Sequence, residues 1–209
     1  EIAVASTKAY ITQLIALYLL ALYLGEIRGV LESDKIKILV EELKIIPGKI
    51  EQVLGEDKIS DIKEYCSHLS RWDDAFFIGR NLDYSVAMEG ALKLKEISYI
   101  HAEAYPAGEL KHGPLALITE GMPVIAIATQ EAIFDKTLSN IQEIGARGGT
   151  VFAIIQNKFD ELITGIDSLF LLPETEEIFA PLLAAIPTQL IAYYTALERG
   201  SAVDKPRNL

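Results

Sequence analysis

Short, continuously apolar runs alternate with longer helical patterns after Asp74, and this alternation limits the folds that the chain can adopt. The apolar runs are residues 75–79, 124–128, 151–155 and 169–172. The helical patterns are residues 89–96, 133–146 and 180–199. Strands buried on both faces are continuously apolar, and parallel strands are joined through crossover helices. The sequence therefore predicts an α/β fold with a mostly parallel sheet flanked by helices.

The first 72 residues are predicted to form a helical segment that precedes the sheet. The helical patterns here cover residues 6–24, 33–43, 47–54 and 59–69. Within the first of them, residues 14–24 form a run of 11 apolar side chains, which is shorter than the ~20 residues that span a bilayer. We therefore expect no membrane contact, and we expect this helix to be buried against a neighbouring module or subunit.

Composition excludes several classes of protein. The chain has 209 residues, of which 50% are apolar, so it can bury one substantial core. Its 19 basic and 30 acidic residues leave a net charge of −11, which argues against a nucleic-acid-binding surface. The single cysteine, Cys66, rules out an intramolecular disulfide, so we expect a reducing, cytoplasmic location. Cys66 lies in a helical pattern and is predicted to be a buried structural thiol.

Three charged side chains gather on one side of the helix predicted at residues 89–96. At 100° per residue, Lys93 and Glu96 lie near Glu89, while the opposite side is apolar. One interpretation is a set of surface ion pairs worth a few tenths of a kcal/mol. The other is an active site, in which partial burial raises the pKa of a carboxyl group and suits it to proton transfer. In either case we interpret Glu89 as a residue that orients or holds Lys93.

A segment punctuated by glycine and proline follows this helix and carries a histidine. We expect residues 101–114 to be irregular, and irregular segments that follow a rigid helix often carry function. His112 lies in this segment between Lys111 and Gly113. A histidine titrates near neutral pH, so it can take up and release a proton during a reaction. His112 is therefore a candidate catalytic residue.

Three stretches of the chain together resemble one known family. They are residues 89–118, the opening EIAVASTKAY of residues 1–10 and the closing VDKPRNL of residues 203–209. The chain is similar to the isomerase half of the glutamine–fructose-6-phosphate aminotransferases, which is built from sugar isomerase (SIS) modules. The resemblance implies a three-layer SIS fold. In that fold, residues 73–209 would form the second SIS module with its C-terminal helix, and residues 1–72 would complete or bridge to an upstream SIS module.

The resemblance also implies a reaction and a set of site residues. Fructose 6-phosphate would become glucosamine 6-phosphate through ring opening, imine formation and proton transfer between C1 and C2. On the matching positions, Glu96 would be the base, Lys93 its charged neighbour, and His112 the group that assists ring opening. Val4, through its backbone, and Ser6 would lie against the sugar. The resemblance implies a homodimer in which His112 reaches the partner's site, and it implies no cofactor and no metal ion.

Several parts of that machinery are expected outside this chain. Ammonia would come from a separate glutaminase domain, and the loop that holds the substrate phosphate would belong to the upstream SIS module. The turn at residues 79–85 contains one arginine, one serine and one aspartate, and we interpret it as a plain strand-to-helix connection. The lysine that forms the imine would lie beyond Leu209. We therefore expect weak turnover, or none, from the isolated chain.

An alternative function remains open. SIS modules also serve as non-catalytic sugar-phosphate-binding regulators, but a sensor needs no proton shuttle, so the combination of Glu96, Lys93 and His112 favours the enzyme. His68 is interpreted as an ordinary surface or cap residue. His101 is interpreted as a structural residue, and its closeness to Glu103 leaves a supporting role open. For Arg207, near the end of the chain, the sequence leaves two roles open: contact with substrate, or fixing the tail.

Overall fold

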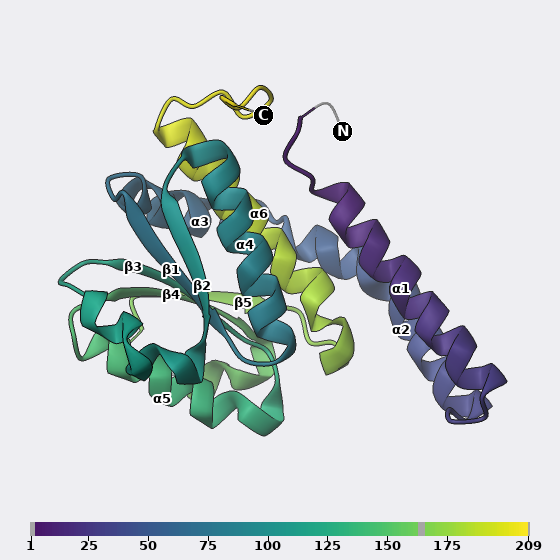
Figure 1. Cartoon of the computed structure of the whole chain (residues 1–209). Coiled ribbons are helices and arrows are strands. Elements are labelled where there is room, and N and C mark those ends of the chain that lie inside the picture. The colour runs from purple at the N-terminus through teal and green to yellow at the C-terminus, as the bar shows by residue number, and fades with distance from the viewer. Residues whose placement is uncertain (1–2, 163–165, 209) are drawn as a thin grey trace.

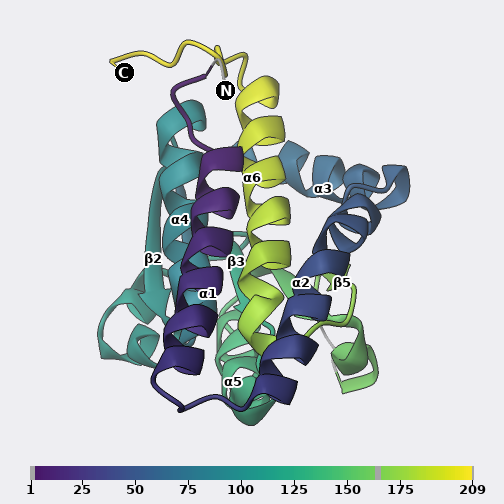
Figure 2. The same ribbon diagram turned by 90° about the vertical axis from the view of Figure 1, so that its right-hand side faces the viewer.

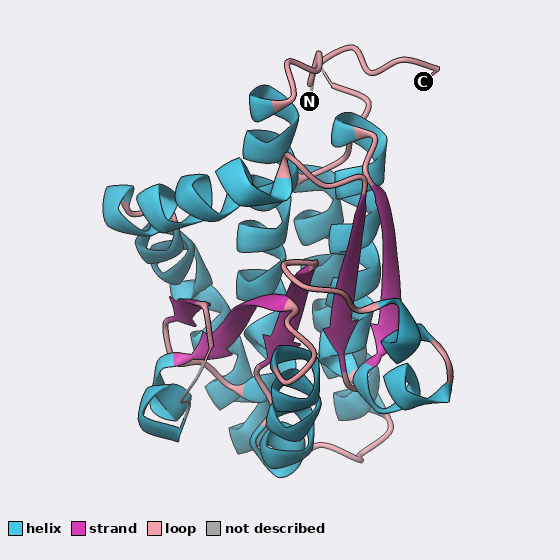
Figure 3. Ribbon diagram, turned by 90° about the vertical axis from the view of Figure 1, so that its left-hand side faces the viewer, coloured by secondary structure: helices cyan, strands magenta, loops and turns pink. Residues whose placement is uncertain are grey.

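The computed structural model describes residues 3–162 and 166–208, and its centre is a five-stranded sheet (Figures 1 and 3). All neighbouring strands are parallel, in the order β2-β1-β3-β4-β5. The strands are β1 (Asp74–Gly79), β2 (His101–Pro106), β3 (Pro123–Ala128), β4 (Thr150–Gln156) and β5 (Ser168–Leu172). The predicted α/β fold with a parallel sheet is confirmed. Glu1, Ile2 and Leu209, which belong to the opening and closing motifs, lie outside the described residues.

The edge strand β2 differs from the prediction, which made residues 101–114 irregular. Residues His101–Pro106 pair with β1 in register, from Asp74 opposite His101 to Gly79 opposite Pro106. The strand was missed because its side chains alternate between alanine and polar groups, as in an edge strand that has solvent on one side. The irregular part begins only afterwards, as the two 3₁₀ helices η1 (Ala107–His112) and η2 (Pro114–Leu117).

Helices cover both faces of the sheet and complete three layers. On one face, α4 (Leu82–Ser98), α6 (Ala180–Glu198) and α3 (Glu56–Leu69) form one hydrophobic core with strand residues such as Phe77 and Phe152. On the other face, α5 (Phe134–Gly145) and η1 pack against Phe76 and Ile78. Successive residues of β1 thus enter different cores, because side chains alternate across a strand. The three-layer expectation is confirmed.

Two long helices, α1 (Lys8–Ile27) and α2 (Ser33–Val53), form a hairpin beside this body (Figures 1 and 2). The prediction of separate helices at 33–43 and 47–54 is wrong, because α2 continues through Pro47. Proline removes one hydrogen bond from a helix interior. The helix is nevertheless held on both sides of Pro47, since the buried residues Leu39, Ile46 and Val53 recur every seven positions and pack on the core.

Helix α1 begins two residues later and ends three residues later than predicted, and it is more exposed than expected. It has 20 residues, and Leu17, Leu20 and Ile27 are exposed along it. By length and composition alone α1 is apolar enough to cross a membrane, as is the mostly buried segment Glu177–Glu198. The shortness of the apolar run alone therefore does not exclude a membrane span. That a neighbouring module or subunit covers α1 stays a prediction.

The helical segment and the sheet share one core. Helix α3 packs on α6 and β5, and its Cys66 thiol is fully buried and donates to the carbonyl of Ile191 at 3.5 Å. Burial raises the pKa of Cys66 to about 12, which agrees with the predicted structural thiol. The division of the chain at residue 72 stays a prediction.

Candidate active site

A buried cluster of charged side chains lies on the second half of α4. The Nζ atom of Lys93 is 2.6 Å from Oε2 of Glu96 and 3.7 Å from Oε1 of Glu89. The exposed fraction is 5% for the Lys93 side chain, 12% for Glu89 and 21% for Glu96. The interpretation as surface ion pairs is wrong, because α6 and the N-terminal segment cover this face of the helix. Buried charges persist only when they are paired, so the three groups hold one another in place.

The cluster carries one net negative charge, and burial affects how it titrates. Burial raises the pKa of Glu89, the nearby ammonium of Lys93 lowers it, and the charge of Glu96 raises it again. The phenol of Tyr10 on α1 is near the same cluster: burial, and then the negative charge of Glu89, raise the pKa of Tyr10 to about 12. The raised pKa thus belongs to Glu89, the acid that holds Lys93 in the cluster.

A cavity of about 410 Å³ opens beside Lys93. It lies between the N-terminal segment, α4, α6 and the C-terminal segment. Its lining residues are Ala3, Ala5, Thr7, Lys8, Lys93, Ile97, Gln189, Ala192, Tyr193, Val203 and Asp204. The predicted contacts Val4 and Ser6 belong to the same segment but alternate with the residues that line the cavity. The segment is thus at the site, while the two side chains do not face into it.

Gln189 is a cavity residue that sequence reasoning missed. Its Nε2 atom is buried without a hydrogen-bond partner among the described residues, and its side chain lines the cavity beside Lys93. A buried donor without a partner is costly unless a ligand or water satisfies it. No local signal marks Gln189, because it lies in the apolar helix α6, more than 90 residues from Lys93 in the sequence.

Glu96 lines a second hollow on the other side of the same helix. This hollow has a volume of about 480 Å³ and lies between the end of α4 and the C-terminal segment. It is lined by Leu92, Lys95, Glu96, Tyr99, Ile100, His101, Arg207 and Asn208. Lys93 and Glu96 are therefore in contact with each other but face different hollows, and both hollows are bordered by residues that follow α6.

His112 lies far from this cluster within one chain. Helix α4 runs antiparallel to the strands, so Glu96 is near the edge of the sheet where β2 begins, and exposed His112 follows the other end of β2. The six residues of β2 span roughly 20 Å at 3.3 Å per residue. A single chain does not bring Glu96 and His112 together. Their meeting across a dimer stays a prediction.

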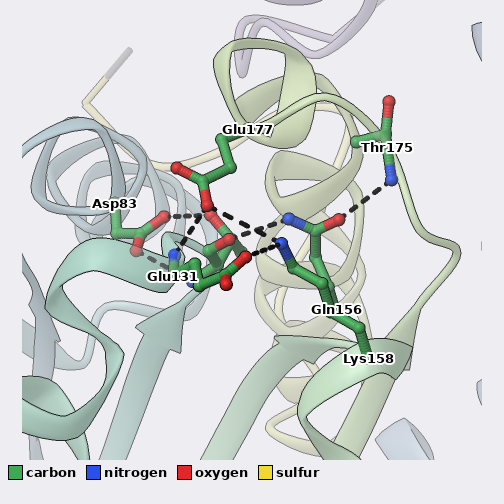
Figure 4. A network of polar contacts seen from close by, with 7 residues as sticks. Asp83, Glu131, Gln156, Lys158, Thr175 and Glu177 are labelled. Carbon is green, nitrogen blue, oxygen red and sulfur yellow. Dashed lines mark hydrogen bonds and ion pairs between the residues drawn. The ribbon is translucent and has the colours of Figure 1, made fainter.

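The carboxyl edge of the sheet holds a network of the chain's own polar groups (Figure 4). The buried carboxylate of Asp83, in the first turn of α4, accepts from the backbone N–H of Thr129 at 2.9 Å and from its hydroxyl at 2.5 Å. Gln156 donates to the carbonyl of Thr129 and accepts from the N–H of Thr175. Lys158 pairs with Glu131 at 2.9 Å and Glu177 at 3.7 Å. An anion at this edge would meet the carboxylate of Asp83, which agrees with a plain connection at residues 79–85.

The remaining candidates have structural contacts. A ring nitrogen of His68 lies 2.9 Å from the carbonyl oxygen of Gly121. His101 lies 3.0 Å from Asp74 and 3.5 Å from Glu103. Arg207 stacks on Tyr99, a contact that fixes the tail, while its contact with substrate stays a prediction. Among the described residues, no three His, Cys, Asp or Glu side chains are placed to hold a metal ion.

Comparison with known proteins connects this geometry to a family. The family model for the SIS domain matches residues 68–199. All of the chain aligns with glutamine–fructose-6-phosphate aminotransferase (isomerizing) of Clostridium tetani at 54% identity and covers 34% of that relative. The relative of the same name from Methanosarcina acetivorans is 49% identical, with the same coverage. The chain therefore spans about a third of the length of the curated relatives it matches.

Solved structures give the same result. The C-terminal domain of glucosamine-fructose-6-phosphate aminotransferase from Francisella tularensis has a TM-score of 0.92 and 41% identity, over 96% of this chain and 56% of that chain. A glucosamine-6-phosphate deaminase from Thermotoga maritima has a TM-score of 0.70 and 25% identity, over 98% of this chain and 56% of that one. The chain belongs to the SIS domain family and corresponds to one part of the larger enzymes named glutamine–fructose-6-phosphate aminotransferase.

Proposed function

We propose that the chain is the isomerase half of a glucosamine-6-phosphate synthase and converts fructose 6-phosphate to glucosamine 6-phosphate. The observation that supports this most is the buried cluster of Glu89, Lys93 and Glu96 beside two hollows. A proton transfer next to a carbonyl or imine needs a carboxylate held in a partly desolvated place. The names of the relatives supply the substrate and the product.

In the proposed reaction, Glu96 takes a proton from one of the carbons C1 and C2 and returns it to the other. The ammonium of Lys93 at 2.6 Å from Glu96 keeps the carboxylate fixed. Because Lys93 also lines the cavity of the N-terminal segment, it can donate to a sugar oxygen on which negative charge develops. Glu89 holds Lys93 from the other side without lining either hollow.

Ring opening requires a second group, and for this step we propose His112 of the partner subunit in a homodimer. The exposure of His112 and its distance from Glu96 along β2 support a role across a subunit boundary. The imidazole moves a proton between the ring oxygen and the hydroxyl formed on opening. The backbone of the segment that contains Val4 and Ser6 lies against the sugar.

Other parts of the reaction are assigned to segments outside this chain. We propose that an upstream SIS module holds the phosphate and covers the exposed face of α1, and that a glutaminase domain supplies ammonia. The imine-forming lysine lies beyond Leu209. The complete enzyme works in the cytoplasm without a cofactor. A non-catalytic sugar-phosphate sensor is the second candidate. A sensor transfers no proton, so this candidate does not explain the buried pair of Lys93 and Glu96.

The test is Glu96→Gln in the complete enzyme. The amide cannot act as a base. We therefore expect the rate of proton exchange between C1 and C2, measured by isotope transfer, to fall by about 10²–10⁴-fold. Binding of fructose 6-phosphate, measured by calorimetry, stays within about threefold, because the phosphate is held elsewhere. The control is Glu64→Gln on the exposed face of α3. Equal loss of exchange and binding would refute the role of Glu96 as base.

A further inference from the structure

The residue that ends α4 has a backbone conformation that its side chain does not favour. Tyr99 directly follows Ser98, the last residue of the helix, with φ +64° and ψ 15°. This is the left-handed region, where glycine or asparagine normally ends a helix because the Cβ atom of other residues is crowded. A tyrosine at this position keeps a side chain at the cost of backbone strain, and such strain concentrates where a side chain has a task.

The side chain of Tyr99 contacts Arg207 in two ways. The guanidinium carbon of Arg207 lies 4.0 Å from the centre of the Tyr99 ring, which is the geometry of a cation–π contact. The hydroxyl of Tyr99 accepts a hydrogen bond from the backbone N–H of Arg207 at 2.8 Å. The ring therefore fixes the Arg207 side chain while the hydroxyl fixes its backbone. The neighbouring Pro206 is buried.

This pair forms one wall of the hollow that contains Glu96. Tyr99 is three residues after Glu96, and both residues line this hollow. Arg207 and Asn208 line it from the C-terminal segment. The C-terminal segment is thus attached to the end of the helix that carries the proposed base. Because Arg207 is held near Glu96, the residues that follow Arg207 along the chain are restricted to positions near Glu96.

We propose that Tyr99 is a positioning residue that anchors the C-terminal segment at Arg207 beside Glu96. This deepens the proposed function, because the lysine expected beyond Leu209 reaches the sugar from this anchor. The strained backbone of Tyr99 is retained because glycine, which suits the position better, has no ring to hold the segment.

The experiment frees the segment without harming the helix. In the complete enzyme, Tyr99→Gly removes ring and hydroxyl and relieves the left-handed backbone, while Tyr99→Phe removes the hydroxyl only. The matched control is Asn81→Gly at the other end of α4, which also has a positive φ, +49°. Trypsin cleaves after Arg207 but not at Lys205, which precedes proline, so release of the C-terminal peptide reports on the anchor by mass spectrometry. Cleavage after exposed Arg147 is the internal reference.

We expect Tyr99→Gly to unfold at the same temperature as the wild type or above it, and to be cleaved after Arg207 about tenfold faster. Tyr99→Phe gives an intermediate rate, and Asn81→Gly gives the wild-type rate. Unchanged cleavage in Tyr99→Gly overturns the anchor. This result needs no turnover, so it stands apart from any failure of the proposed function.

Turnover of fructose 6-phosphate tests the positioning role. We expect kcat of Tyr99→Gly to fall about tenfold or more while KM changes little, because a displaced reactive segment affects the chemical step. Faster cleavage with unchanged kcat overturns positioning. A wild-type enzyme without turnover overturns the proposed function and leaves the cleavage result to decide on the anchor.

Discussion

Lys93 illustrates how a single residue combines stability and chemistry in this protein. Its ammonium is almost fully buried, and burial of an unpaired charge would cost several kcal/mol. The carboxylates of Glu89 and Glu96 pair with this ammonium and offset that cost. With both carboxylates ionised, the cluster has one more negative charge than positive charges. Burial raises the pKa of Glu89, and the neighbouring charge of Glu96 adds to this effect. The cluster is thus held by a cation that needs both acids, beside a cavity that a substrate can enter.

A second buried acid, Asp83, gives a prediction at the residue scale. Asp83→Ala leaves the N–H and the hydroxyl of Thr129 buried without an acceptor, so we expect a loss of about 1–3 kcal/mol in the free energy of unfolding. Asp83→Asn retains both hydrogen bonds, since its oxygen accepts from the N–H and its amide donates to the hydroxyl. We expect Asp83→Asn to be near wild type. Urea denaturation measures both values.

The pH dependence of the same variants checks the charge of Asp83. Burial raises the pKa of Asp83 above its ordinary value of 3.8. In the pH range above 3.8 the folded state therefore binds more protons than the unfolded state, and stability falls as pH rises. Glu89 acts in the same direction above 4.5. We expect Asp83→Asn to lose stability less steeply between pH 4 and 7 than the wild type, and an equal slope would contradict this.

At the scale of elements, α4 positions the site because it packs unusually close to its neighbours. Gly90 lies in the middle of the helix, where a Cβ atom would be 2.7 Å from Cε1 of Phe77 on β1 and 2.9 Å from Cβ of Thr188 on α6. A glycine in a helix interior is normally unfavourable. Here the absence of a side chain lets α4 contact the sheet and α6 at once. This contact holds α4, and with it Lys93, against α6 at the wall of the cavity.

We therefore expect Gly90→Ala to destabilise the protein by about 1–3 kcal/mol, because the added methyl group overpacks the core. The control is Gly48→Ala in α2, where, apart from its chain neighbours and the nearby helix backbone, none of the described residues comes within 4 Å of the new Cβ. That change should stabilise the protein by about 0.5–1 kcal/mol, as alanine favours a helix interior. The two midpoints of denaturation must move in opposite directions. A stabilising Gly90→Ala would show that α4 can shift away at no cost.

At the scale of the whole molecule, the chain has features that point beyond itself. Helix α1 exposes an apolar side. The segment that precedes α1 borders the cavity beside Lys93 through Ala3, Ala5 and Thr7. His112 is exposed on the edge of the sheet opposite to Glu96. The chain thus presents an acid in one place and a histidine in another, which is the arrangement expected if two copies exchange catalytic groups.

Mixed dimers of the complete enzyme test this exchange. We combine Glu96→Gln with His112→Asn, each inactive alone. If His112 acts in the partner's site, each mixed dimer contains one site with both native residues, and random mixing restores about a quarter of the wild-type activity. If both residues act within one chain, no site is intact and activity stays at the level of the single variants. The two variants carry different affinity tags, and purification over both tags in succession verifies that mixed dimers have formed.

The main outline of the fold was predictable, and the exceptions have identifiable causes. Strands β1, β3 and β4 are buried along almost their whole length, and β5 is buried on one face and partly buried on the other. Their continuous apolar runs could therefore be recognised without knowledge of the neighbouring strands. Strand β2 was not predictable, because an alanine-and-polar alternation becomes a strand only when β1 provides hydrogen bonds. Pro47 was interpreted as a break, but packing at Leu39, Ile46 and Val53 holds α2 together on both sides of it.

The candidate site divides in the same way. Local spacing on one helix determined that Glu89, Lys93 and Glu96 meet, since residues three and four apart share a face. Whether that face is solvated or buried was decided by α6 and the N-terminal segment, which are far away in the sequence. Gln189, the Tyr99–Arg207 contact and the separation of His112 from Glu96 also depend on the tertiary structure. Sequence determines what lies within one turn of a helix or one strand, while burial and proximity between distant segments arise only when the layers pack.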